Sequence, residues 1–553
     1  FGNLMMSKNL KLAKLVLCRS SHRIKSLLSL EKLAEVDAKF EKVASDFCGN
    51  NSSSTHKGVR EIMKMAGGSN KVTKHTRILG PDGIPAQSQF EENTIVQKHF
   101  AKTMHSNITD FEIVVEKELS QSYCGAQERF DGITTSDLII AMPSPTQMRS
   151  GLLKRKKGKG HGENNITNGY LHDFAEDITY LEWPVYVKTF LRIQPPLQWK
   201  GGMACALFKG KGSPALIENH RDIMLGNDNG KTFADRVRQN IIHLVRHISL
   251  SSQFGSGLNG GETSMAHVYI RSIIDMSKHA ELFAMVLFID VASAFATMLR
   301  RIVFDTEQGD EAWIAQLRIN GFSESDIGEI FEQIKSINFS ENGEGIRYTG
   351  SDIGVSIAFA ITQQLYSNTW VSVEGVPGCI SATEGSCAGM PLADIIYSVA
   401  MSRVLNRIRT QLLKIDGNLS GELQQIRIKG TTHQLCEVSF YDDSAFSFLS
   451  VADRISDVTR DVVAVIIDVF RMFYLDVNMK KNKTEAIISA YGPGSKRSKR
   501  LLAKADNIIK VPTRAGEVEL RIVPSYKHLG TDTTAVASNC GEEVHIRSAI
   551  MVQ

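Results

Sequence analysis

The sequence predicts a fold of the α+β class. Of its 553 residues, 42% are hydrophobic, 22% are charged and 7% are aromatic, a composition that excludes wholesale disorder. A short continuous apolar run at residues 284–289 is typical of a strand buried on both faces. Alternating apolar residues on both sides of positions 441–444 predict a hairpin. Apolar residues at helical spacing recur before and after these segments, so helices and strands share one chain.

Length and charge restrict the function only broadly. A chain of this length allows roughly three to four domains of about 150 residues each. Lys and Arg number 64 and Asp and Glu 60, which gives a net charge of +4, a field too weak to indicate a partner. No apolar run reaches 18 residues, so no membrane partner is expected. The eight cysteines form no C-x-x-C pair, which favours reduced intracellular thiols over disulfides or zinc.

Residues 1–130 are expected to form a helical N-terminal region and a linker ahead of the main domains. Apolar residues at helical spacing and recurrent Lys and Arg through residue 26 fit either a helix or a transit peptide. Residues 49–90 are polar and rich in glycine, with a strong turn signal at 80–83. A helical pattern resumes at 91–103. The sequence begins with Phe1 and ends as if within a helix, so we expect a piece of a longer product.

Residues 154–169 form a second break. Five of the first six residues are basic, and Gly and Asn recur after them, so no regular element is expected. The run fits a solvated loop, a phosphate contact or a nuclear localisation signal. Further along, apolar residues at helical spacing predict helices around residues 233–248, 295–303, 392–408 and 455–473.

Three acids carry the strongest chemical signal. Asp290 ends the buried strand, and Asp442 and Asp443 lie at the tip of the hairpin, so pairing of the strands would bring the carboxylates into one cleft. Such oxygen clusters bind Mg²⁺ or Mn²⁺, and two such ions about 3.5–4 Å apart support in-line nucleotidyl transfer. Adjacent acids are also common in ordinary turns, because Asp suits turn positions.

Other short segments surround these acids in a fixed order. They are residues 80–83 with His99 and Phe100, then 159–166, 196–200, 207–212, 219–225, 253–255, 288–295, 385–392, 440–443, Asn478 with 483–485, and 526–530. In this order they resemble the reverse transcriptase of non-LTR (LINE-type) retrotransposons, over about residues 80–535. Residues 288–295, 385–392 and 440–443 resemble polymerase motifs A, B and C, Asn478 with 483–485 resembles motif D, and 526–530 resembles the primer-grip turn.

The resemblance implies a right-hand polymerase with fingers and palm. Fingers would span residues 131–280, and the palm 281–520 with a fingers insertion around 300–380. Residues 521–553 would begin a thumb that is mostly absent. The palm is expected to contain a small antiparallel sheet backed by helices. The implied function is RNA-directed DNA synthesis with two Mg²⁺ or Mn²⁺ ions, an RNA template, a DNA primer and dNTPs. Element RNA, target DNA and a nuclear location follow from the family alone.

The resemblance also assigns roles to particular residues. Asp290, Asp442 and Asp443 would be metal ligands, with Lys483 as the general acid that protonates pyrophosphate. The nucleotide would meet Lys209, Arg221, Phe295 and Gly389, and the primer and template would meet Tyr441, Tyr526, Lys527, Leu529 and Gly530. The ring of Phe295 would exclude a 2′-hydroxyl and so favour dNTPs. Lys209, Arg221 and Lys483 also fit ordinary surface charge, and Phe295 fits a core position.

The sequence departs from the family pattern at several places. Motif B has Ala388 in place of Gln, and Ala393-Asp394 in place of Ser-Pro. Ala296 replaces an Asp that usually follows the Phe of motif A, and His220 and Asp222 replace Tyr and Pro. These changes leave open a catalytically inactive retrotransposon remnant that only binds nucleic acid. An RNA-templated RNA polymerase and an intron-type reverse transcriptase are further alternatives.

Three other patterns compete with this interpretation. A G-x-G-x-x-G at 255–260 formally fits a dinucleotide-binding turn, but a helical pattern precedes it and the next strand-end acid comes about 30 residues later, where roughly 20 is expected. His243 and His247 are spaced for a metal on a helix, although a basic helix face is the plainer interpretation. Residues 496–500 form a second cationic run, either solvated or in contact with a nucleic-acid backbone.

Overall fold

The computed structural model describes residues 76–121, 134–258, 263–304, 310–336, 353–419, 425–428, 431–434 and 437–535, with three single helical positions at 38, 41 and 45. The chain divides into two compact units, Phe1–Thr76 and Arg77–Gln553, and all of the described strands lie in the second. The helix expected near the N-terminus, most of the linker before residue 76 and the thumb segment after 535 lie outside the described residues. None of the described helices is long and apolar enough to cross a membrane.

A five-stranded sheet in the described part of the chain combines distant segments. Its order is β1 (Asn107–Thr109), β7 (Cys379–Ala382), β6 (Thr369–Ser372), β2 (Gly202–Phe208) and β3 (His220–Gly226). Strands β2 and β3 form an antiparallel hairpin, whereas β2 and β6 run parallel. The sheet therefore draws strands from the segments expected to be the N-terminal region, the fingers and the fingers insertion. The expected domain boundaries themselves stay predictions.

Helices α3 (Gln89–Thr103) and α4 (Phe111–Ser120) pack on this first sheet. The helices α6 (Thr135–Ala141), α7 (Pro145–Leu153), α8 (Asn168–Asp173), α9 (Ala175–Arg192), α10 (Asp228–Ile248) and α15 (Ile353–Leu365) belong to the same part of the chain. Helices α13 (Asp310–Ile319) and α14 (Glu324–Ser336) instead contact the region of the second sheet, where Trp313 donates to the carbonyl of Met472 at 2.9 Å. Helix α10 forms because its apolar residues recur at helical spacing and are buried, as at Phe233, Val237 and Ile241. The ring of Phe233 packs 4.9 Å from that of Tyr186 and 4.8 Å from that of Trp199.

A seven-stranded sheet carries the acids. Its order is β13 (Ile508–Thr513), β14 (Gly516–Ile522), β12 (Glu485–Ala490), β5 (Phe283–Ile289), β11 (Asp443–Ser450), β10 (Val438–Phe440) and β4 (Gln253–Phe254). Two hairpins lie outside it, β15 (Ser525–His528) with β16 (Thr531–Thr534), and β8 (Gln425–Ile428) with β9 (Thr431–Gln434). Strand β5 lies near the middle of the sheet, between β12 and β11.

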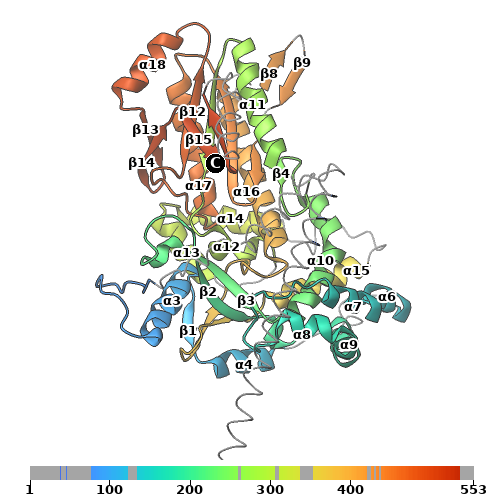
Figure 1. The fold of residues 1–553 in the computed structure, drawn as a ribbon. Helices are drawn as coiled ribbons and strands as arrows, with labels where there is room; N and C mark the ends of the chain where they lie inside the picture. Colours follow the sequence, from blue (N-terminus) through green and yellow to red (C-terminus); the bar gives the residue numbers. More distant parts are fainter. Residues whose placement is uncertain are drawn as a thin grey trace, which may run out of the picture. The chain divides into compact units, whose positions relative to one another are not determined.

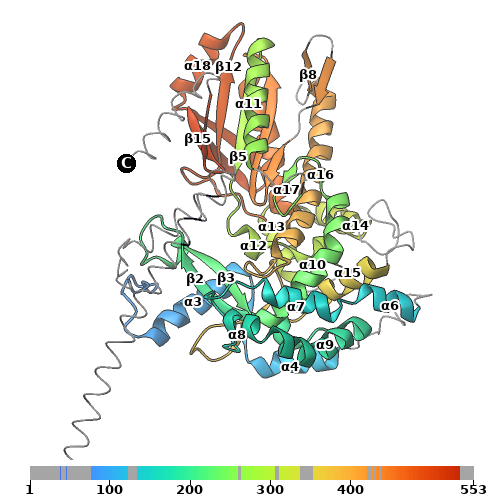
Figure 2. The same cartoon turned by 45° about the vertical axis from the view of Figure 1, so that its right-hand side comes forward.

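Helices cover both faces of the seven-stranded sheet, as Figures 1 and 2 show. Helix α11 (Thr263–His279) packs on one face, where Ile270 and Ile274 contact Val286 and Phe288. The other face belongs to the main core, which includes α16 (Ala393–Leu419) and α17 (Ile455–Met472). Because β5 is covered from both sides, all seven of its residues are buried. Helix α12 (Ala294–Thr297) follows β5, and α18 (Ser495–Lys504) follows β12.

The predicted mixture of helices and sheets is confirmed, as are the buried strand, the hairpin with acids at its tip, and helices α10, α16 and α17. The expected small antiparallel sheet is found only in part: its central strand pairs are antiparallel, but the sheet is larger than expected and mixed in orientation. The sheet has seven strands among the described residues, and β12 pairs with β14, and β10 with β4, in parallel. The helix expected at 295–303 is also shorter: α12 ends at Thr297, and a single 3₁₀ turn covers Arg300–Ile302.

Candidate active site

The acids meet at one end of the seven-stranded sheet. Strands β5 and β11 are antiparallel, with Ile289 opposite Ser444. Asp290 and Asp443 are therefore each one residue beyond the same pair, on neighbouring strands. Asp442 lies in the two-residue turn between β10 and β11, because Phe440 pairs directly with Asp443. Sequence reasoning thus placed all three acids correctly at a shared strand end.

Both the main chain and the side chain of Asp290 are fixed by polar contacts. Its carboxylate Oδ1 lies 3.1 Å from Nζ of Lys483, and its Oδ2 accepts a hydrogen bond of 3.2 Å from the side-chain amide of Asn478. The amide of Asp290 donates to Oγ1 of Thr484 at 3.1 Å, and its carbonyl accepts from the amide of Asn478 at 2.9 Å. The segment that resembles motif D therefore fixes the acid that resembles motif A.

Negative charge is concentrated at this corner. Burial, together with the nearby charges of Asp442 and Asp290, raises the pKa of Asp443 to about 6, and the charge of Lys483 opposes this shift. Burial also raises the pKa of Asp442, with Asp290 adding to the shift, while Arg221 and Lys483 oppose it. A cation at this corner would relieve the repulsion between the carboxylates.

Within the described ranges, no group of three or more His, Cys, Asp or Glu side chains is placed to hold a metal ion. The carboxylate of Asp290 points instead to Lys483 and Asn478. The roles of Asp290, Asp442 and Asp443 as metal ligands, and of Lys483 as a general acid, stay predictions.

Tyr441 holds the acid turn in an unusual backbone conformation. Its φ is +57°, a left-handed value that is costly for a bulky residue unless its surroundings fix it. Its hydroxyl accepts a hydrogen bond of 2.9 Å from the amide of Ser256. A Cβ at Gly255 would approach the Tyr441 ring within 3.1 Å, so the glycine leaves room for the ring. The structure thus gives Tyr441 a positioning role beside its predicted primer contact.

A charged pair that sequence reasoning missed supports the same turn. Arg238 on α10 makes a two-pronged ion pair with Asp394 at the start of α16, with Nη2 2.8 Å from Oδ2. The guanidinium also donates to the carbonyls of Pro391 at 2.6 Å and Ser256 at 3.4 Å. Asp394 is one of the departures from motif B, and its partner is 156 residues away. The contact with Arg238 therefore gives Asp394 a structural role.

Two cations from the β2–β3 hairpin are close enough to interact electrostatically with the acids at the corner. Arg221 is exposed and opposes the rise in the pKa of Asp442. Burial lowers the pKa of Lys209, while the nearby charges of Asp222 and Asp290 oppose that shift. The ammonium of Lys209 donates to the carbonyl of Glu218 at 2.8 Å. The hairpin therefore brings its positive charges toward the acids, as the predicted triphosphate contacts require.

Phe295 lies between the acid turn and α16. Its half-buried ring stacks on Tyr397 with centroids 4.7 Å apart, and it lies 6.3 Å from the ring of Tyr441. Its carbonyl accepts a 2.7 Å hydrogen bond from the amide of Ser386, so the loop that resembles motif B touches the turn after β5. Both the predicted contact with the sugar and a plain packing role fit this position.

The backbone conformation and close packing at position 389 explain why this residue is a glycine. Its φ is +104°, and an added Cβ would lie only 2.4 Å from the carbonyl oxygen of Met224. The neighbouring carbonyl of Ala388 accepts a 2.7 Å hydrogen bond from the amide of Met224. The glycine therefore lets this loop pack on β3, and its predicted contact with the nucleotide stays a prediction.

The segment that resembles the primer-grip turn forms the β15–β16 hairpin. His528 pairs with Thr531, and Leu529 and Gly530 between them have φ values of +48° and +86°, which is the pattern of a type I′ turn. The Tyr526 ring stacks on Phe288 at 4.4 Å, and its hydroxyl donates to the carbonyl of Lys483 at 2.6 Å. Lys527 is exposed. The predicted turn is confirmed, and the contacts of Tyr526, Lys527, Leu529 and Gly530 with primer stay predictions.

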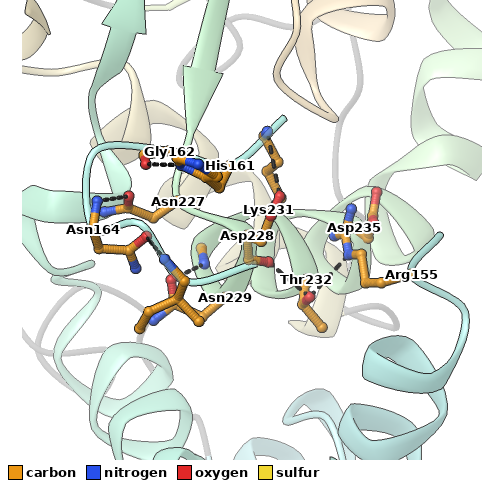
Figure 3. A network of polar contacts seen from close by, with 12 residues as sticks. Arg155, His161, Gly162, Asn164, Asn227, Asp228, Asn229, Lys231, Thr232 and Asp235 are labelled. Atoms are coloured by element: carbon orange, nitrogen blue, oxygen red, sulfur yellow. Dashed lines mark hydrogen bonds and ion pairs between the residues drawn. The ribbon is translucent and has the colours of Figure 1, made fainter. Parts of the chain in front are cut away.

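The first cationic run is partly docked on the start of α10 (Figure 3). Arg155 donates to Asp235 at 2.6 Å and to Thr232 at 3.0 Å, and Lys157 pairs with Asp173. The loop after it is fixed by Asn227, whose side chain accepts from the amide of Asn164 at 3.2 Å. No helix or strand forms between residues 154 and 167, as predicted, but α8 begins at Asn168, within the last two residues of the expected break. Two of the run's five cations therefore have acidic partners.

The competing dinucleotide motif is preceded by helix α10 and the two-residue strand β4, and residues 259–260 of it lie outside the described residues. No family model matches the sequence, and no curated protein matches it.

Proposed function

We propose that the chain is an RNA-directed DNA polymerase of the non-LTR retrotransposon type. It would add deoxynucleotides to the 3′-hydroxyl of a DNA primer on an RNA template. The supporting observation is the corner where Asp290 and the turn at Asp442 and Asp443 end neighbouring strands of a buried sheet. In this proposal the seven-stranded sheet belongs to the palm and the five-stranded sheet to the fingers.

The donor set suits the expected cations. Carboxylate oxygens are the ligands that Mg²⁺ and Mn²⁺ prefer, and burial raises the pKa of Asp443 to about 6 beside two further acids. Asp290 and Asp442 would hold both ions, with Asp443 as a looser third ligand. When bound, two such ions activate the primer hydroxyl and stabilise the leaving pyrophosphate.

The remaining residues would bind and orient the nucleotide. Lys209 and Arg221 would neutralise the triphosphate from the side of the β2–β3 hairpin. Lys483, whose Nζ lies 3.1 Å from Asp290 Oδ1, would donate a proton to pyrophosphate. Phe295 would lie against the sugar at C2′ and exclude a hydroxyl there. Tyr441, held by Ser256, would fix the direction of the acid turn.

The second candidate is an inactive remnant that binds nucleic acid without copying it. The observation that favours it is the contact of Asp290 with Lys483 and Asn478, which uses the carboxylate that a metal ion would need. The replacement of the motif B glutamine by Ala388 points the same way.

Primer extension on an RNA template with dNTPs and Mg²⁺ or Mn²⁺ tests the proposal. The parent chain is compared with Asp442→Asn and with Asp461→Asn, a matched change at an exposed position on α17. Product from the parent and from Asp461→Asn, but not from Asp442→Asn, supports the polymerase. Absence of product from all three with primer–template still bound favours the remnant. Loss of both synthesis and binding contradicts both candidates.

A further inference from the structure

Helix α18 carries a cationic face that the proposed polymerase does not use. Its ten residues contain no acid, and its basic side chains are Lys496, Arg497, Lys499, Arg500 and Lys504. All five are exposed. None of them forms an ion pair with any residue that the structure describes. The first cationic run differs, because Arg155 and Lys157 there are paired with acids.

The five cations point away from the body of the protein together. At about 100° per residue, they cover one continuous side of the helix, and the two buried residues, Ser498 and Leu502, lie on the other. The hydroxyl of Ser498 donates to the carbonyl of Ala452 at 2.9 Å. The helix is thus anchored by its buried side, and the orientation of its cationic side is fixed.

This face lies at the opposite end of the sheet from the acids. Strand β12 ends at Ala490, which pairs with Phe283 at the beginning of β5, whereas Asp290 follows the end of β5. Seven strand residues separate the two ends by roughly 20 Å at about 3.3 Å per residue. In Figures 1 and 2, α18 lies at the far end of the sheet from α12. A nucleotide bound at the acid corner therefore does not reach α18.

We infer that the exposed face of α18 binds the phosphate backbone of a nucleic-acid segment distinct from the one at the acid corner. A ten-residue helix is about 15 Å long, which matches about four phosphates of one strand at about 3.4 Å spacing. The contact would be independent of base sequence, because flexible Lys and Arg side chains on a convex surface meet phosphates first.

A membrane surface fits this helix less well. Interfacial helices insert a broad apolar face opposite their cations, but the apolar face of α18 is used for packing. Leu501 is the one large apolar side chain that the helix exposes, at 56%. A solvated polyanion therefore suits α18 better than a lipid bilayer.

The test removes the charges and keeps the helix. Lys496, Arg497, Lys499 and Arg500 are changed together to Gln, and a matched variant changes four exposed helical lysines elsewhere, Lys98, Lys102, Lys117 and Lys188, to Gln. Binding of labelled 24-base-pair duplex DNA and of a 24-nucleotide single-stranded RNA is measured across a salt series. Circular dichroism and thermal melting check that both variants stay folded.

We expect the α18 variant to lose about tenfold or more in affinity for at least one of the two probes near 0.1 M salt. The slope of log K against log salt should become shallower by about 3 to 4, since each of the four lost phosphate contacts removes about 0.7–0.9. The probe that loses more identifies whether α18 serves the duplex or the single strand. The matched variant should lose less than about threefold.

Three results would overturn the inference. One is unchanged affinity and slope for both probes. Another is an equal loss in the matched variant, which would indicate bulk charge alone. Loss of binding to anionic vesicles with no change for either probe would assign α18 to a membrane surface and also overturn it. The test needs no polymerase activity, so the inference can hold or fail separately from the proposed function.

Discussion

The two ends of the seven-stranded sheet carry opposite charges, which are fixed by partner residues at one end and exposed to solvent at the other. At the acid end, Asp290 is bound by Lys483 and Asn478, and Arg238 and Asp394 form a pair that reaches the turn of Tyr441. At the other end, the basic side chains of α18 extend into solvent from a helix anchored through Ser498. Charges that the fold holds in fixed geometry suit chemistry on defined atoms. Charges on exposed, flexible side chains suit contact with an extended polyanion.

The largest effect is expected from neutralising one fixed charge at the acid end. Asp290→Asn keeps the size of the side chain but removes a carboxylate from the corner, so we expect primer extension to fall by about 10³-fold, or about 4 kcal/mol in the activation barrier. Single-turnover extension measures the loss. The pair of Asp290 with the half-exposed Lys483 contributes about 0–1 kcal/mol to folding, so thermal melting should hardly change. A large drop in melting temperature instead would make Asp290 a structural residue.

The next effect concerns selectivity at the same end. Phe295→Ala opens the space beside Tyr397 and Tyr441, so we expect the preference for dNTPs over rNTPs to fall by about 10- to 100-fold, in the range of pocket-based discrimination. The kcat/KM ratio for the two nucleotide classes measures it. Phe331→Ala, which removes a ring packed 4.9 Å from that of Trp313 away from the acids, is the matched control. An unchanged ratio in Phe295→Ala would leave that ring with a packing role alone.

A smaller effect follows from the pKa of Asp443, which burial raises to about 6. A carboxyl whose pKa is higher folded than unfolded favours the folded state when protonated, and this contribution is lost as pH rises through about 6. Asp443→Asn removes the dependence. In metal-free buffer we expect the variant to be more stable than the parent by about 1–3 kcal/mol at pH 8. The difference should vanish near pH 4, and denaturant melts at both pH values measure it.

Equal stability of Asp443→Asn and the parent at pH 8 would mean that the corner is better solvated than its burial indicates. A stabilising substitution at an acid is typical of sites where function and folding conflict. If the two stabilities are equal, the contrast with α18 becomes weaker, because the charges at both ends of the sheet would then cost little folding free energy.

The acid end could be predicted from the sequence because its signals are local. The apolar run of β5 and the alternation around Tyr441 each fall within eleven residues, so they predict Asp290, Asp442 and Asp443 at strand ends without any knowledge of the strand pairing. The period of 3.6 likewise revealed α10, α16 and α17.

The features that the sequence could not show depend on distant contacts. Arg238 and Asp394 are 156 residues apart, and no spacing rule connects them. The mixed sheet was missed because β4 has only two residues, too few for an alternating pattern, and because the parallel pairing of β12 with β14 is set by the chain's path through α18 and β13. Short strands and ion pairs between helices are tertiary features, so local patterns carry little information about them.

The smallest expected effect is on folding free energy when the charges of α18 are removed, and it tests the contrast between the two ends of the sheet most directly. Changing Lys496, Arg497, Lys499 and Arg500 to Gln removes four exposed charges that make no ion pair with described residues, so each change should alter folding free energy by no more than about 0.5 kcal/mol. Removing mutual repulsion along the helix should even stabilise it slightly at low salt, and this gain should disappear as screening increases. Urea melts at low and high salt measure both. A loss of several kcal/mol that persists at high salt would show that α18 is held by its charges, and the contrast between the two ends of the sheet would fail.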